Sequence, residues 1–66
     1  MLTATQLEEM FLNYLAKKEM ASKKMIQADL GLDRRQANWV ITRFWNRSII
    51  DREYIDGVAY WKIDPN

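Results

Sequence analysis

The sequence predicts an α+β fold in which three helices are followed by a two-stranded antiparallel hairpin. Apolar residues recur with the helical period up to about residue 48, and three segments begin with capping residues. From residue 50 the period changes from 3.6 to 2, and an Asp-Gly pair interrupts the new pattern. A chain of 66 residues is too short for two cores, so residues 1–66 are expected to form one domain.

The first helix is expected over residues 4 to 18. Thr5 with Glu8 fits a capping box, and Thr3 with Gln6 is a second pair with the same spacing. Its apolar residues fall at i, i+3, i+4, i+7 and i+8, which predicts one buried stripe. This stripe consists of Leu7, Met10, Phe11, Tyr14 and Leu15.

The second helix is expected from about residue 23 to 30, with Ser22 as its N-cap. Gly31 should end it, because glycine adopts positive φ without steric cost. Its buried side is predicted to contain Met25, Ile26 and Leu30.

The third helix should restart after two or three residues and reach about residue 47 or 48. Asp33 is the expected N-cap, and Gln36 completes a capping box. Trp39 projects about 200° from the buried centre, whereas Trp45, at about 80°, should pack beneath the hairpin. The predicted buried face consists of Ala37, Val40, Ile41, Phe44 and Ser48.

Residues 50–63 read as a hairpin, because Asp56-Gly57 supplies the two positive-φ residues of a type I′ turn. The register set by this turn places Asp51 opposite Lys62, a favourable cross-strand pair. The face better suited to the core carries Ile50, Arg52, Tyr54, Ala59, Trp61 and Ile63.

The net charge of +1 conceals an uneven distribution. Residues 22–48 contain six basic and two acidic residues, whereas both flanking segments are net acidic. A local basic surface on a near-neutral chain indicates an anionic partner, and a solvated face without a partner is the alternative. The sequence has no histidine and no cysteine, so no metal and no cofactor are expected.

An enzyme is the weakest functional interpretation. Histidine and cysteine are absent, only two glycines occur, and the adjacent Glu8 and Glu9 point in different directions on a helix. No apolar run approaches 18 residues, and the acidic N-terminal segment does not resemble a signal peptide. We therefore expect a cytoplasmic protein without a membrane segment or an evident small-molecule ligand.

The segment "MIQADLGLDRRQANWVI" has the spacing of a helix-turn-helix: Gly31 makes the turn, Leu32 fills the corner and Ala37 lets the helices approach closely. With "IQADLGLDRRQA", an apolar helix and a hairpin ending in "AYWKI", the chain resembles bacterial winged helix-turn-helix regulators, particularly the small regulators of fimbrial operons. The resemblance implies sequence-specific DNA binding with the third helix in the major groove. Two features depart from the pattern: Gln27 stands where a small residue is usual, and the wing "EYIDGVAY" is short and acidic.

The candidate DNA-binding residues lie mainly on the outward face of the third helix. Arginine can bind guanine, and asparagine or glutamine can bind adenine. The candidates for base contacts are Arg34, Arg35, Gln36, Asn38 and Trp39, with Thr42 on the same face. The candidates for phosphate contacts are Arg43, Arg47, and Ser22, Lys23 and Lys24 at the start of the second helix.

The leading hypothesis is a small sequence-specific transcriptional regulator that binds double-stranded DNA. Its recognition helix spans about residues 34–47, and it acts as a dimer or with a partner protein. The alternative is a protein-interaction module of phage or plasmid origin that docks on a host factor through the Trp39 face. Trp39 could also be covered by the N-terminal segment or the tail.

Overall fold

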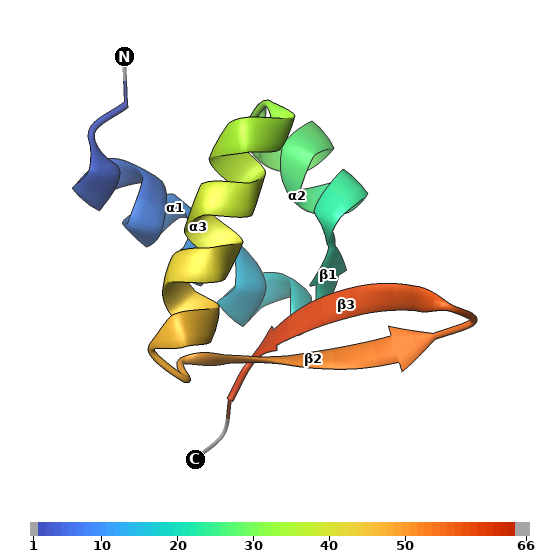
Figure 1. Ribbon diagram of the computed structural model, residues 1–66. Helices are drawn as coiled ribbons and strands as arrows, with labels where there is room; N and C mark the ends of the chain where they lie inside the picture. Colours follow the sequence, from blue (N-terminus) through green and yellow to red (C-terminus); the bar gives the residue numbers. More distant parts are fainter. Residues whose placement is uncertain (1, 65–66) are drawn as a thin grey trace.

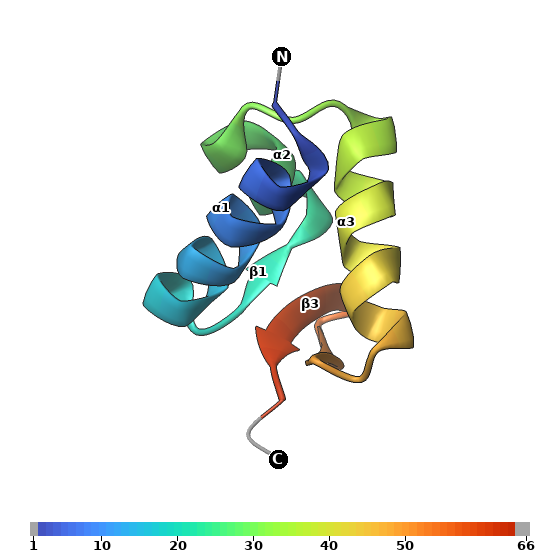
Figure 2. The same ribbon diagram turned by 90° about the vertical axis from the view of Figure 1, so that its left-hand side faces the viewer.

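The computed structural model describes residues 2–64, and the three predicted helices are all present in it. The hairpin extends along the base of the helices, and its turn projects beyond α2 (Figure 1). Seen from the side, α1 and α2 lie together on one side of the molecule and α3 lies on the other (Figure 2). The elements in chain order are α1 (Ala4–Lys18), β1 (Ala21–Ser22), α2 (Lys23–Leu30), α3 (Arg34–Asn46), β2 (Ile50–Ile55) and β3 (Val58–Ile63).

The sheet has three strands in the order β1-β3-β2, so the expectation of a two-stranded hairpin alone was wrong. The extra strand is the short link between α1 and α2, where Ala21 pairs with Trp61 and Ser22 with Tyr60. Ser22 is also the N-cap of α2, and its extended backbone (φ −77°, ψ 166°) suits both roles. Two residues are too few to show a strand period in the sequence.

The first helix has the expected bounds but uses the second of the two possible caps. The Thr3 hydroxyl accepts a hydrogen bond from the Gln6 amide at 3.1 Å, and the Gln6 side chain accepts one from the Thr3 amide at 2.9 Å. Thr5 therefore lies inside α1. Glu8 takes no part in the capping box, and its carboxylate is available for a contact elsewhere.

Both helices of the helix-turn-helix begin as predicted, and the turn between them also forms as predicted. Ser22 caps α2 by accepting a hydrogen bond from the Met25 amide at 3.2 Å. Gly31 ends α2 in the left-handed conformation, with φ 66°. Asp33 and Gln36 form the predicted capping box of α3.

The end of α3 differs from the prediction, because the helix stops at Asn46. Ser48 has a positive φ of 58°, so the chain leaves the helical path there and Ser48 is exposed instead of buried. The Ile49 amide donates a hydrogen bond to the Phe44 carbonyl at 3.1 Å. This bend directs the chain into β2.

The core lies where the three helices meet the base of the sheet. Phe11 of α1 and Phe44 of α3 stack with ring centroids 5.4 Å apart. The Tyr14 hydroxyl donates a hydrogen bond to the Asp29 carboxylate, which links α1 to α2. The buried apolar residues are Leu7, Phe11, Tyr14, Leu15, Ala21, Ile26, Leu32, Ala37, Val40, Ile41, Phe44 and Ile50. Three residues predicted to be buried, Met10, Met25 and Leu30, are only partly so.

The hairpin has the predicted register throughout, with positive φ at both turn residues, Asp56 (52°) and Gly57 (80°). Its predicted core face is largely open: Ile50 is buried, whereas its cross-strand partner Ile63 is 37% exposed and Tyr54, near the turn, is 62% exposed. The side chain of Lys62 forms its ion pair with Glu53, at 3.6 Å, and not with the opposite Asp51. Ala59 and Trp61 are half-buried on the same face, beside Arg52, which is exposed.

Candidate nucleic-acid interface

The outward face of α3 gathers most of the predicted DNA-binding residues around one shallow depression of about 530 Å³. The helix contains no acidic residue between Arg34 and Asn46. Guanidinium groups, amides, a hydroxyl and an indole therefore share one continuous surface. The residues around the depression are Arg35, Asn38, Trp39, Thr42, Arg43, Asn46 and Arg47.

Trp39 lies on this face with 39% of its surface exposed, so residues 2–64 cover it only in part. The Arg43 guanidinium lies 5.3 Å from the centroid of the Trp39 ring. Positions i and i+4 of a helix are neighbours, and a guanidinium over an indole face forms a cation–π contact. The indole is therefore held against α3 and presents its remaining surface to solvent.

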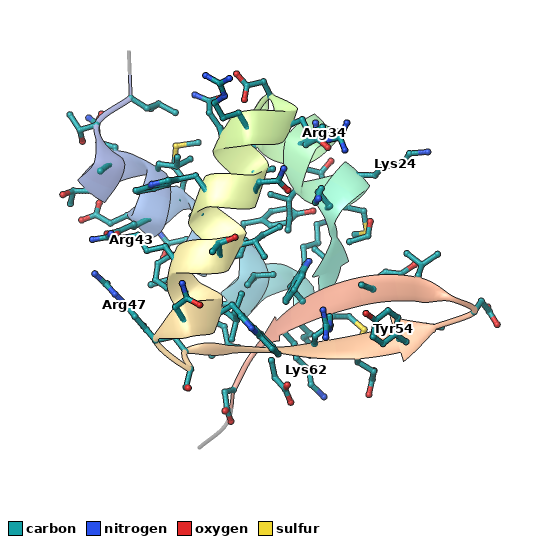
Figure 3. All side chains as sticks on the ribbon, viewed as in Figure 1. Lys24, Arg34, Arg43, Arg47, Tyr54 and Lys62 are labelled. Atoms are coloured by element: carbon teal, nitrogen blue, oxygen red, sulfur yellow. The ribbon has the colours of Figure 1, made fainter. Side chains whose placement is uncertain are left out.

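A carboxylate from α1 reaches the same arginines. The Arg43 Nε donates a hydrogen bond to Glu8, and Arg47 Nη1 lies 4.0 Å from the same Glu8 oxygen. Figure 3 shows Arg43 and Arg47 on the side of α3 that faces α1. The sequence did not reveal this contact, since it depends on how two helices far apart in the chain cross.

Two predicted base-contacting residues lie apart from this depression. Arg34 is exposed at the start of α3 on the side toward α2 (Figure 3). Gln36 is half-buried, and its side-chain oxygen accepts a hydrogen bond from the Asp33 amide at 3.0 Å. That oxygen is engaged in the capping box. Gln36 can therefore bind adenine through both the oxygen and the nitrogen of its side-chain amide only if the capping box opens.

The start of α2 lies beside α3, as the helix-turn-helix pattern requires. Lys23 lines a hollow of about 220 Å³ together with Asn38 and Thr42 of α3. Lys24 is exposed and lies away from α3 (Figure 3). Ser22 is only 8% exposed, and its hydroxyl caps α2, so the lysines are the more accessible groups of this predicted phosphate site.

One face of the hairpin holds a cluster of cation–π contacts that the sequence analysis did not predict. The Arg52 guanidinium lies 5.1 Å from the ring centroids of Trp45 and Tyr54 and 5.6 Å from that of Trp61. Trp45 and Trp61 meet edge to face at 5.6 Å. Trp45 thus contacts the hairpin as expected, although it remains 40% exposed. We call these four residues the arginine–aromatic cluster. The sequence placed Arg52, Tyr54 and Trp61 on one face of the hairpin and Trp45 beneath it, but it did not indicate that the guanidinium lies among the three rings.

Comparison with family models finds no match, and comparison with curated proteins finds no relative. Among solved structures, the chain is similar to the crystal structure of the AntR antimony-specific transcriptional repressor, with a TM-score of 0.72 and 20% sequence identity. The match covers 96% of this chain and 56% of that chain. The fold is a winged helix. This is the fold that the helix-turn-helix spacing and the hairpin predict.

In this winged helix, α2, the turn at Gly31 and α3 are the helix-turn-helix, and the β2–β3 hairpin is the wing. The unusual Gln27 is half-buried, and its backbone carbonyl accepts hydrogen bonds from the end of α2, including one of 2.9 Å from Leu32. The wing turn carries Asp56 between the exposed Ile55 and the Gly57-Val58 pair, without a basic residue. Within residues 2–64, no helix is long and apolar enough to cross a membrane.

Proposed function

We propose that this chain is a small sequence-specific DNA-binding transcriptional regulator whose recognition helix, α3, enters the major groove. The observation that carries the proposal is the outward face of α3, where Arg35, Asn38, Trp39 and Arg43 surround one depression and the helix contributes no acidic side chain. These side chains combine hydrogen-bond donors for base edges with positive charge for phosphates. The likeness in fold to a transcriptional repressor supports the same function.

The orientation of α3 divides the contacts between bases and backbone. The N-terminal half of a recognition helix generally meets the base edges. Arg35 and Asn38 are then the principal base contacts, with Trp39 against thymine methyl groups or sugars. Arg43 and Arg47 lie farther along α3 and suit phosphates, as do Lys23 and Lys24 at the start of α2. Arg34, Gln36, Thr42 and the Ser22 hydroxyl complete the proposed interface.

A single recognition helix makes few phosphate contacts, so we expect the regulator to act as a dimer or with a partner protein. Two copies double the number of bases read, and the spacing of half-sites then follows from the geometry of the pair. The AntR chain is the longer of the two, since the match covers 56% of it. A DNA-binding regulator of this kind is expected to act in the cytoplasm, at the nucleoid.

The test measures binding to short duplexes over a range of salt concentrations. Arg35→Ala combined with Arg43→Ala should weaken binding and flatten the dependence of log K on log salt by about 0.9 per lost phosphate contact. Lys17→Ala combined with Lys18→Ala is the matched control, because it removes the same charge at the exposed end of α1. Equal affinity and equal salt slope in the arginine variant and the wild type would refute the proposal.

The exposed Trp39 favours a second candidate function, docking to a protein on a winged-helix scaffold. Tryptophan is enriched at binding hot spots, and 39% of this side chain is exposed at the centre of the α3 face. Trp39→Ala separates the two candidates. Loss of duplex affinity with unchanged pull-down of a protein partner supports major-groove binding, whereas intact duplex binding with loss of partner pull-down supports docking.

A further inference from the structure

Arg52 is a cation that the wing holds in place, and no carboxylate within residues 2–64 forms an ion pair with it. Its guanidinium contacts three aromatic rings, at 5.1, 5.1 and 5.6 Å from their centroids. The ion pairs among residues 2–64 involve Arg43, Arg47 and Lys62, and Arg52 is not among them. Aromatic faces fix the position of a guanidinium while leaving its N–H groups free to donate at their edge. Arg52 is therefore a positioned, unpaired donor.

Arg52 lines a hollow to which two other elements, α2 and α3, bring further anion-binding groups. The same hollow of about 220 Å³ is lined by Lys23 from α2 and by Asn38 and Thr42 from α3. Two cations, an amide and a hydroxyl thus converge above the indoles of Trp45 and Trp61. The hollow is smaller than the roughly 300–1,000 Å³ typical of small-molecule pockets, which favours one group of a larger ligand.

The hollow is continuous with the proposed DNA-binding face. Asn38 and Thr42 line both this hollow and the depression along α3. A duplex whose base edges meet Arg35 and Asn38 would place its backbone beside the wing side of α3. The group that enters the hollow in that arrangement is a phosphate, which a guanidinium binds through paired hydrogen bonds and an ammonium through its charge.

We propose that Arg52, together with Lys23, binds a phosphate of the DNA backbone at the base of the wing, next to the bases contacted by α3. The site rests on the proposed function, because it needs α3 in the major groove. In this proposal the wing contacts the DNA backbone through the arginine–aromatic cluster. The acidic turn at Asp56 does not contact the DNA. Because the rings already order Arg52, little side-chain entropy is lost on binding.

The test compares Arg52→Gln with Lys62→Gln, its matched control. Lys62 is on the opposite face of the same hairpin, so both variants lose one positive charge from the wing. Arg52→Gln should reduce duplex affinity by about tenfold at low salt, as expected for the loss of a charge-assisted hydrogen bond. It should also flatten the salt slope by about 0.9, whereas Lys62→Gln should leave both quantities near the wild-type values.

A second measurement on the wild type does not depend on how a variant folds. The Arg52 Nε–Hε resonance should shift when a short duplex is titrated into the labelled protein, and Arg52→Lys should keep the salt slope with reduced affinity. Failure of the wild type to bind any duplex would overturn the proposed function. Wild-type binding with an unshifted Arg52 resonance and an unaltered Arg52→Gln slope would overturn only this site. A shift caused by an acidic peptide but not by the duplex would also overturn it, in favour of a protein carboxylate.

Discussion

Substituting Glu8→Gln should weaken the fold and strengthen DNA binding at the same time. In the free protein Glu8 holds Arg43 by a hydrogen-bonded ion pair and lies 4.0 Å from Arg47. Both arginines are proposed phosphate contacts, so a duplex must either displace Glu8 or accept a carboxylate beside its backbone. The glutamine keeps the size of the side chain and removes only the charge.

The magnitude follows from the exposure of the pair. The side chains of Arg43 and Glu8 are 41% and 20% exposed, so solvent screens the attraction and the pair belongs to the surface class of about 0.2–1 kcal/mol. For a domain of this size, that loss lowers the Tm by about 1 to 8 °C. If binding must break the pair, the same free energy becomes a gain of about 1.4- to 5-fold in duplex affinity.

The assay is fluorescence anisotropy of a labelled duplex at fixed low salt, paired with thermal unfolding followed by circular dichroism. Glu9→Gln is the control, since Glu9 is exposed, adjacent, and absent from the ion pairs within residues 2–64. Glu9→Gln changes the net charge by the same amount as Glu8→Gln, but it leaves the ion pair between Glu8 and Arg43 intact. The reasoning is refuted if Glu8→Gln binds no more tightly than the wild type, or if Glu9→Gln gives the same gain.

Three further predictions concern stability. Phe44→Ala should destabilise the fold by about 3–5 kcal/mol, because it removes the stacked partner of Phe11 from the core. In a urea titration much of this small domain should already be unfolded before urea is added. Gly31→Ala should cost about 1–2 kcal/mol, because φ is 66° there while no atom lies within 4 Å of the added carbon; an unchanged urea midpoint would contradict this. Burial, the hydrogen bond to Asp29 and its negative charge raise the pKa of Tyr14 from 10.0 to about 12. The folded state therefore holds the Tyr14 proton more tightly than the unfolded state does. The resulting contribution to the free energy of unfolding is present below pH 10 and is lost as the pH rises from 10 through 12. Tyr14→Phe should therefore lose less stability than the wild type over this pH range.

The sequence predicted the features that depend on neighbouring residues. The caps at Ser22 and Asp33, the turn at Gly31 and the hairpin register all depend on groups within a few positions of one another. The first cap was ambiguous for the same reason: Thr3 and Thr5 offer the same spacing, and local rules do not choose between them. The pattern of apolar and polar residues also predicted most of the buried residues, because the helical period alone identifies the buried stripe of each helix.

The features that were missed depend on how distant elements meet. Strand β1 is two residues long and forms only because β3 passes beside it. The contact between Glu8 and Arg43 requires a particular crossing of α1 and α3. Arg52 was assigned to a core face by strict alternation, but its side chain stays exposed, with its guanidinium among the rings of Trp45, Tyr54 and Trp61.

The strand order has a consequence for how the chain acquires its sheet. Because β3 lies between β1 and β2, each of those strands has its hydrogen-bonding partner in the last strand of the sequence. During synthesis the helices can form from local interactions, whereas Ala21 and Ser22 must wait for residues 60 and 61. The base of the wing, where Arg52 meets Trp61, is thus completed only after the three helices have been synthesised. A chain cut within β3 would retain α3, the proposed recognition helix, but would lose the strand that pairs with both β1 and β2.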